Sequence, residues 1–179
     1  MEMLRMDHIT KIYPNGFVAN KDVTFAVNEG EIHSLVGENG AGKTTLMKIL
    51  FGMEDKQGGD IFIREQKVKI TSPLDAISKG VGMVHQHFML LNSLTVAENV
   101  VLGIEPMKNG LFDFEEAVVM TQKIADKYNF ALDARTRVKD LSVGQMQKVE
   151  ILKALIKGAR VLILDEPTAV LTPQETEEL

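Results

Sequence analysis

The sequence predicts an α/β fold, and three stretches carry that prediction. The first is the glycine-rich run GENGAGKT at residues 37–44, which stands between a short apolar run and a stretch of good helix formers. The second is the apolar run VLIL at residues 161–164, which is followed by two carboxylates. The third is the loosely alternating apolar pattern of residues 4–27, which is typical of an antiparallel hairpin.

The glycine-rich run has the strand–loop–helix context of a phosphate-binding loop. Residues 32–36 are short and mostly apolar and predict a buried strand, whereas residues 45–51 predict a helix with an apolar face. Between them, Gly37, Gly42, Lys43 and Thr44 fit the pattern glycine, four residues, Gly-Lys-Ser/Thr. The alternative is a chance glycine turn, against which the strand and the helix on either side argue.

This pattern predicts a polyphosphate site. Glycines let the backbone turn its N–H groups inward, and the new helix adds unpaired N–H groups and the positive end of its dipole. We expect Lys43 to reach the outer phosphates as a point charge and the hydroxyl of Thr44 to bind Mg²⁺.

Composition narrows the class of protein. The chain has 179 residues, enough for one domain with a sizeable core, and 45% hydrophobic and 25% charged residues are ordinary for a globular protein. A net charge of −5 without a basic block argues against nucleic acid as the main partner. There is no cysteine, no apolar signal segment and no run of membrane-spanning length, so a role at a membrane would depend on a partner.

The other elements follow from apolar periodicity, turn residues and caps. Further strands are predicted at residues 4–13, 23–27, 61–63, 68–70 and 81–84. Pro73 begins a predicted helix that runs to Ser78, and the chain is mostly helical from Thr95. Later helices are expected at residues 114–128, after a predicted cap at Ser142, and from Pro173.

The carboxylates after the apolar run 161–164 define a second candidate site. The run is expected to be a strand covered on both sides. Asp165 and Glu166 would stand at its carboxyl end, where ligands bind in open α/β sheets. A strand that simply runs out into solvent would look the same. With a phosphate loop upstream, we expect Asp165 to hold the Mg²⁺ shell and Glu166 to polarise the attacking water.

Over its whole length the sequence resembles the nucleotide-binding domain of ATP-binding cassette (ABC) transporters, because five motifs occur in the family's order. They are the adenine-stacking aromatic at Tyr13, the phosphate loop at residues 37–45, the Q-loop glutamine at Gln86, the signature LSVGQ at residues 141–145, and the Walker B strand with its catalytic glutamate at residues 161–166. Taken alone, Tyr13 would be a packing residue and Gln86 a surface loop residue.

The resemblance implies ATP and Mg²⁺ as ligands and assigns the site. Glu166 is the implied catalytic residue. The implied nucleotide-binding residues are Tyr13, Gly37, Asn39, Gly40, Ala41, Gly42, Lys43, Thr44, Thr45, Gln86, Ser142, Gly144 and Gln145. The implied metal ligands are Thr44, Gln86 and Asp165.

Three departures from the family pattern refine this reading. Val143 replaces a signature glycine, and Thr172 stands where an aspartate is usual. With the stretches HQHFML at 85–90 and VEILKAL at 149–155, these resemble the first cassette of sugar or nucleoside importer ATPases. The family's switch histidine has no counterpart, so we expect the sequence to be an N-terminal fragment.

The expected architecture is one ABC ATPase domain over residues 1–179, incomplete at its C-terminus: a P-loop α/β core (1–88 and 161–179) with an antiparallel β region and an inserted helical subdomain (89–160). The implied function is ATP hydrolysis that drives solute import. The implied partners are a second cassette, membrane permease subunits and, indirectly, a solute-binding protein, at the cytoplasmic face of the plasma membrane. The alternatives are a soluble ABC ATPase acting on nucleic acid or the ribosome, and a P-loop kinase of small molecules.

Overall fold

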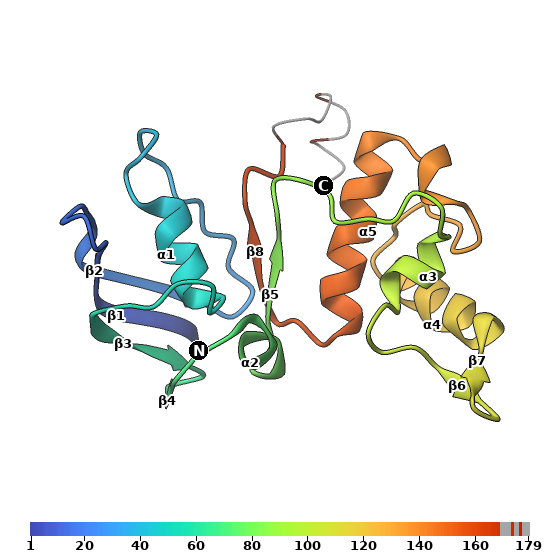
Figure 1. Cartoon of the computed structure of the whole chain (residues 1–179), viewed down its shortest axis with the longest axis horizontal. Helices are drawn as coiled ribbons and strands as arrows, with labels where there is room; N and C mark the ends of the chain where they lie inside the picture. Colours follow the sequence, from blue (N-terminus) through green and yellow to red (C-terminus); the bar gives the residue numbers. More distant parts are fainter. Residues whose placement is uncertain (169–172, 174–175, 177–179) are drawn as a thin grey trace. The chain divides into compact units, whose positions relative to one another are not determined.

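The computed structural model describes residues 1–168, 173 and 176. The chain divides into two compact units, Met1–Gly82 and Met83–Leu179, and each is described by itself. Both contain helices and strands, as predicted (Figure 1). The division 1–88, 89–160 and 161–179 stays a prediction.

The first unit is built on a four-stranded sheet in the order β2-β1-β3-β4, and its pairings are antiparallel. Its elements are β1 (Glu2–Ile12), β2 (Val18–Asn28), α1 (Lys43–Leu50), β3 (Gly58–Ile63), β4 (Gln66–Val68) and α2 (Pro73–Ser78). In register, Met6 of β1 faces Phe25 of β2 on one side and Ile61 of β3 on the other. The predicted antiparallel region is therefore confirmed, with β2 longer than expected.

The core of this unit lies between the sheet and α1. Met6 and Ile9 of β1 are fully buried, and Ile61 of β3 is nearly so. The helix α1 lies over the sheet (Figure 1) and buries Leu46, Ile49 and Leu50, which form the apolar face predicted for this helix.

Residues 32–36 do not form the predicted strand. They lie in an irregular segment, where Ile32 is 97% exposed and Val36 is 92% exposed. A short apolar run becomes a strand only when a neighbouring strand pairs with its N–H and C=O groups. The sheet of the first unit, in the order β2-β1-β3-β4, includes no strand from this run. Apolar content alone was therefore a misleading signal here.

The second unit carries most of the helical part of the chain. Its helices are α3 (Val96–Val100), α4 (Phe114–Lys127), the 3₁₀ turn Val138–Asp140 and α5 (Val143–Ile156). Its strands are β6 (Met107–Lys108), β7 (Leu111–Phe112) and β8 (Val161–Leu164), and β5 (Val81–Val84) stands where the first unit ends and the second begins. The helices and the segments between them bury two apolar clusters. The larger consists of Val96, Val100, Ala125, Leu132, Val138, Leu141, Val149 and Leu152, and the smaller of Ala97, Val101, Ala117 and Ala134.

Side-chain caps fix the starts of these helices. Thr95 and Ser142 each form a reciprocal capping box, with Glu98 and Gln145 respectively. Asp113 caps α4 by accepting a hydrogen bond from the backbone N–H of Glu116 at 3.1 Å. These caps satisfy backbone N–H groups that the first helical turn leaves unpaired.

Two features of the second unit differ from expectation. The hairpin of β6 and β7 was not predicted, although Asn109 and Gly110, with φ of 53° and 81°, form the Asn-Gly turn typical of hairpins. Strand β8 pairs with β5 in a two-stranded sheet. Because it has this one neighbour in the described part of the chain, only Ile163 is buried and Leu164 is 37% exposed, so β8 is not covered on both sides.

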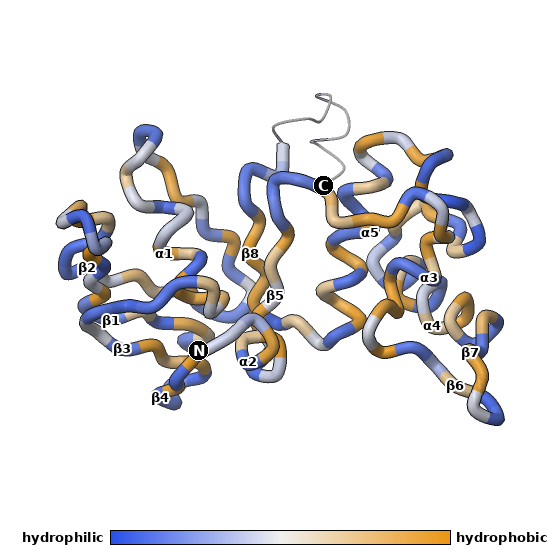
Figure 2. Tube along the Cα trace, in the orientation of Figure 1, coloured by the Kyte–Doolittle hydropathy of each residue, from blue (hydrophilic) through white to orange (hydrophobic). Residues whose placement is uncertain are grey.

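Figure 2 shows β8 as an apolar segment and the chain as hydrophilic just beyond it. Thr172 and most of the helix expected from Pro173 lie outside the described residues. Among the helices that the structure describes, none has the length and apolar content needed to cross a membrane.

Candidate nucleotide-binding and catalytic site

The glycine-rich loop lies open to solvent at the start of α1. Residues 37–41 are exposed, so the loop itself is accessible to a ligand, although the backbone N–H of Ala41 donates to the Glu38 carbonyl at 3.2 Å. The ammonium of Lys43 bends back over the loop and donates hydrogen bonds to the carbonyl oxygens of Gly37 and Glu38, each at 2.8 Å. Thr44 and Thr45 follow in the first turn of α1. The arrangement places a cation and a helix N-terminus at one loop, which suits a polyanion.

Gly42 anchors the loop to the sheet. Its φ is +86°, in the left-handed region, and a Cβ built there would lie 2.2 Å from the backbone oxygen of Ala19 and 2.8 Å from the amide nitrogen of Asn20. Asn20 is 6% exposed and donates a hydrogen bond to the Gly42 carbonyl at 3.2 Å. Asn20 therefore supports the loop, and no motif in the sequence pointed to it.

Gly42→Ala is expected to destabilise the chain by about 2–5 kcal/mol, because it adds the left-handed strain of a Cβ to a clash with backbone. The matched control is Gly40→Ala. Gly40 also has a left-handed φ of +84°, but a Cβ there meets nothing within 4 Å, so only the strain of about 1–2 kcal/mol is expected. Chemical denaturation measures both values. Equal losses in the two variants would contradict the proposed anchoring role of Gly42.

Tyr13 stands just after β1, on a tight turn beside α1. Its hydroxyl lies 3.4 Å from the hydroxyl of Thr45, and its ring stacks on Phe17 with centroids 6.3 Å apart. The ammonium of Lys11 lies 5.0 Å from the Tyr13 ring centroid. Phe17 is 53% exposed and was not predicted as a site residue. The two stacked rings place an aromatic pair beside Thr45, in the first turn of α1.

The second unit brings Gln86, Asp165 and Glu166 together. The backbone N–H of Asp165 donates to the Val84 carbonyl at 3.1 Å, which extends the pairing of β5 and β8 to the carboxylates. The side-chain amide of Gln86 then donates to the Glu166 carboxylate at 2.9 Å. Glu166 has a left-handed φ of 50°, an uncommon conformation that occurs more often at functional sites. The exposed Glu166 and Gln86 side chains are thus in direct contact.

The signature residues form the start of α5. Ser142 caps the helix by accepting from the backbone N–H of Gln145 at 3.2 Å, while the Gln145 side chain accepts from the backbone N–H of Ser142 at 2.9 Å. Gly144 is buried in the first turn, and Val143 is 40% exposed. The spacing of serine and glutamine in this motif is therefore also the spacing of a capping box.

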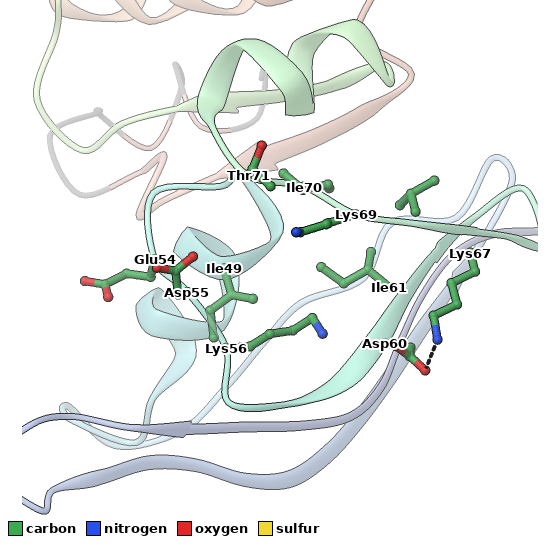
Figure 3. A pocket seen from close by; sticks show the side chains of 11 residues that line it. Ile49, Glu54, Asp55, Lys56, Asp60, Ile61, Lys67, Lys69, Ile70 and Thr71 are labelled. Atoms are coloured by element: carbon green, nitrogen blue, oxygen red, sulfur yellow. Dashed lines mark hydrogen bonds and ion pairs between the residues drawn. The ribbon is translucent and has the colours of Figure 1, made fainter.

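The predicted metal ligands fall in both units: Thr44 in the first, Gln86 and Asp165 in the second. Among the described residues, no group of three or more histidine, cysteine, aspartate or glutamate side chains is arranged to hold a metal ion. A separate hollow of about 450 Å³ lies between α1 and the strands β3 and β4 (Figure 3). It contains none of the predicted site residues, and Lys67 at its rim is paired with Asp60 at 2.8 Å.

Comparison with known proteins agrees with these motifs. The sequence profile of the ABC transporter family matches residues 20–169. The chain is 50% identical, over 99% of its length, to the guanosine import ATP-binding protein NupO of Bacillus subtilis (strain 168). It is 45% identical to the nucleoside import ATP-binding protein NupA of Lactococcus lactis and 42% identical to a ribose import ATP-binding protein of Streptomyces avermitilis, in each case over 99% of the chain. It spans about a third of the length of these relatives (34%, 35% and 34%).

Solved structures give the same answer for the fold. The chain matches the ADP conformation of an ATP-binding cassette of an ABC transporter with a TM-score of 0.85 and 26% identity, over 99% of the chain and 74% of the cassette. It also matches a dimeric cassette bound to ADP and phosphate, with a TM-score of 0.76, 27% identity, and coverage of 98% and 79%. The predicted P-loop α/β fold is confirmed, and the chain belongs to the ABC transporter family, as an ATP-binding domain close to the sugar and nucleoside import ATP-binding proteins.

Proposed function

We propose that the chain binds and hydrolyses ATP and thereby powers the import of a sugar or a nucleoside through an ABC transporter. The main observation behind this is the glycine loop with Lys43 folded over it at the start of α1, in a chain 42–50% identical to import ATP-binding proteins for guanosine, nucleosides and ribose.

ATP binding is assigned to the residues of the first unit. The triphosphate accepts hydrogen bonds from the N–H groups of residues 37–45, and Lys43 exchanges its contacts with the Gly37 and Glu38 carbonyls for contacts with the outer phosphates. The adenine stacks on the ring of Tyr13, which is itself stacked on Phe17.

Hydrolysis is assigned to the residues of the second unit. Glu166 takes a proton from the attacking water and so acts as the general base. Gln86, which holds the Glu166 carboxylate in this structure, orients it. The oxygens of Thr44, Gln86 and Asp165 are of the kind that Mg²⁺ prefers, and they would hold this ion, which neutralises charge on the phosphates when bound.

Transport requires partners that the chain itself does not contain. The proposed partners are a second cassette, whose signature residues complete the nucleotide site, and membrane permease subunits. A solute-binding protein, which delivers the solute to the permease subunits, is an indirect partner. Ser142, Gly144 and Gln145 of this chain would complete the site of the second cassette in return. A solved cassette that the chain resembles is dimeric with ADP and phosphate bound, which supports the pairing. The proposed location is the cytoplasmic face of the plasma membrane.

Mg-ATP is expected to raise the melting temperature of the 179-residue chain without rapid turnover. A ligand that binds only the folded state stabilises it by about 2.7 kcal/mol at a hundred times its dissociation constant. Turnover is expected to be slow because the signature of a second cassette is absent from the assay. A thermal-shift measurement beside a phosphate-release assay tests both statements.

The control for this experiment is the same chain without nucleotide and with Mg-GTP. Fast phosphate release by the monomer would contradict the requirement for a second signature. Transfer of phosphate to an added small-molecule acceptor rather than to water would instead indicate a kinase. Co-purification with nucleic acid, and with no membrane protein, would favour the soluble alternative.

A further inference from the structure

The backbone shortly after Gln86 is held by two charged side chains of α5. The N–H of Met89 donates to a Glu150 carboxylate oxygen at 2.5 Å, and the Met89 carbonyl accepts from the Lys153 ammonium at 2.8 Å. Glu150 and Lys153 are themselves paired at 3.0 Å. Glu150 is 8% exposed, so this carboxylate is buried against the segment that it binds.

The backbone of Leu91, two residues further along the chain, is also held by a side chain. The N–H of Leu91 donates to the side-chain oxygen of Asn99 at 2.8 Å, and the Asn99 amide donates back to the Leu91 carbonyl at 3.1 Å. Side chains of α5 and α3 thus bind both the backbone N–H and the carbonyl oxygen of Met89 and of Leu91, while Leu90, between them, packs on the larger apolar cluster of the second unit.

We propose that Glu150 and Lys153 are positioning residues, which fix the segment carrying Gln86 to the helix that begins with the signature residues. The inference rests on the proposed ATPase function. Glu150 lies about 12 Å along α5 from the cap residue Ser142, given a rise of about 1.5 Å per residue. On the other side, Met89 lies within about 11 Å of chain from Gln86.

The charged groups of Glu150 and Lys153 are suited to hold the Met89 backbone firmly. Both hydrogen bonds to Met89 involve an ionised group, and such bonds are shorter and about twice as strong as neutral ones. A buried carboxylate that lost its partners would be left unsatisfied, so the pair resists partial opening. A shift of the Gln86 segment is thus transmitted to α5, and the contact of Gln86 with Glu166 depends on the same attachment.

The test compares Glu150→Ala and Glu150→Gln with Leu152→Ala in the full 179-residue chain. Leu152 is fully buried on the same helix but belongs to the larger apolar cluster. Leu152→Ala therefore controls for a loss of stability that does not involve the contacts with Met89. Amide hydrogen exchange at residues 87–91 is measured under conditions where all variants are folded. Glu150→Ala is expected to speed exchange at Met89 at least about ten-fold beyond Leu152→Ala, and Glu150→Gln, which keeps an acceptor oxygen, to restore most of the protection.

A second readout follows the side chain of Gln86 by its ¹⁵N amide signal. In Glu150→Ala this signal is expected to move to the position of a solvated glutamine, and in Leu152→Ala to stay unchanged. When this chain is paired with its second cassette, Glu150→Ala is expected to lower kcat for ATP hydrolysis and to leave KM for ATP unchanged.

The outcomes separate this inference from the proposed function. Unchanged exchange at Met89, or an unmoved Gln86 signal, in folded Glu150→Ala overturns the positioning role. An unchanged kcat with faster exchange overturns it as well, because the attachment would then not serve turnover. Absence of ATP hydrolysis by the unmodified chain with its second cassette would instead contradict the proposed function. The hydrogen exchange at Met89 and the side-chain signal of Gln86 would still show whether Glu150 holds the Gln86 segment.

Discussion

Glu166→Gln is expected to slow ATP hydrolysis by about a hundred-fold or more, the usual scale for the loss of a general base, while ATP binding stays intact. The amide keeps the size of the carboxylate and an oxygen that accepts from Gln86, a contact of 2.9 Å in this structure. It cannot take a proton from water. The measurement is phosphate release by the pair of cassettes, beside ATP affinity by calorimetry.

The matched control is Glu116→Gln, the same exchange on the exposed surface of α4. It is expected to turn over at the normal rate. Near-normal hydrolysis by Glu166→Gln would assign the role of general base to another residue. Loss of ATP binding would show that the Glu166 carboxylate is needed to bind ATP rather than to hydrolyse it.

Local signals in the sequence predicted most elements correctly, because each depends on its own residues. Pro73 and Ser78 bound α2 as predicted, and β5 and β8 have the predicted limits. Ser142 was identified as a cap because a serine before an apolar periodic run satisfies the first helical N–H groups. Caps, proline positions and helical periodicity act within about one turn, so they can be read without the rest of the chain.

Signals that depend on a distant partner were less reliable. Residues 32–36 have the composition of a strand but pair with none in their unit, and β8 is less covered than an unbroken apolar run suggests. Whether an apolar segment is buried is decided by what packs on it, which composition does not contain. The hairpin of β6 and β7 was overlooked although Asn109-Gly110 is a local signal, because two-residue strands carry little apolar pattern.

The candidate site likewise contains residues that motifs predicted and contacts between distant residues that no motif predicted. The loop residues and the two carboxylates follow from motifs, since nucleotide chemistry requires those residue types at fixed spacing. The contact of Gln86 with Glu166 joins residues 80 apart, and that of Met89 with Glu150 joins residues 61 apart. The second of these uses the backbone of Met89, so no side chain at that position could announce it. Asn20 is missed for a similar reason, since it binds only the carbonyl of Gly42.

Lys43→Ala is expected to weaken ATP binding at least about ten-fold, the scale of one or two lost charge-assisted hydrogen bonds. Lys43 is the cation that the motif aims at the outer phosphates, and in this structure it is held over the loop by the Gly37 and Glu38 carbonyls. These carbonyls belong to exposed residues and can turn to water, so the free energy of unfolding is expected to change by no more than about 1 kcal/mol. Calorimetry in Mg²⁺ buffer measures the affinity.

Two comparisons make this result specific to the loop. Lys48→Ala removes an equal charge from the last turn of α1, at the far end of the helix from the loop, and is expected to leave ATP affinity unchanged. Lys43→Arg keeps the charge but not the compact ammonium, so it is expected to recover only part of the affinity. If Lys43→Ala binds ATP as tightly as the unmodified chain, the glycine loop is not the phosphate site, because no binding mode that places the outer phosphates in this loop could be indifferent to losing its cation.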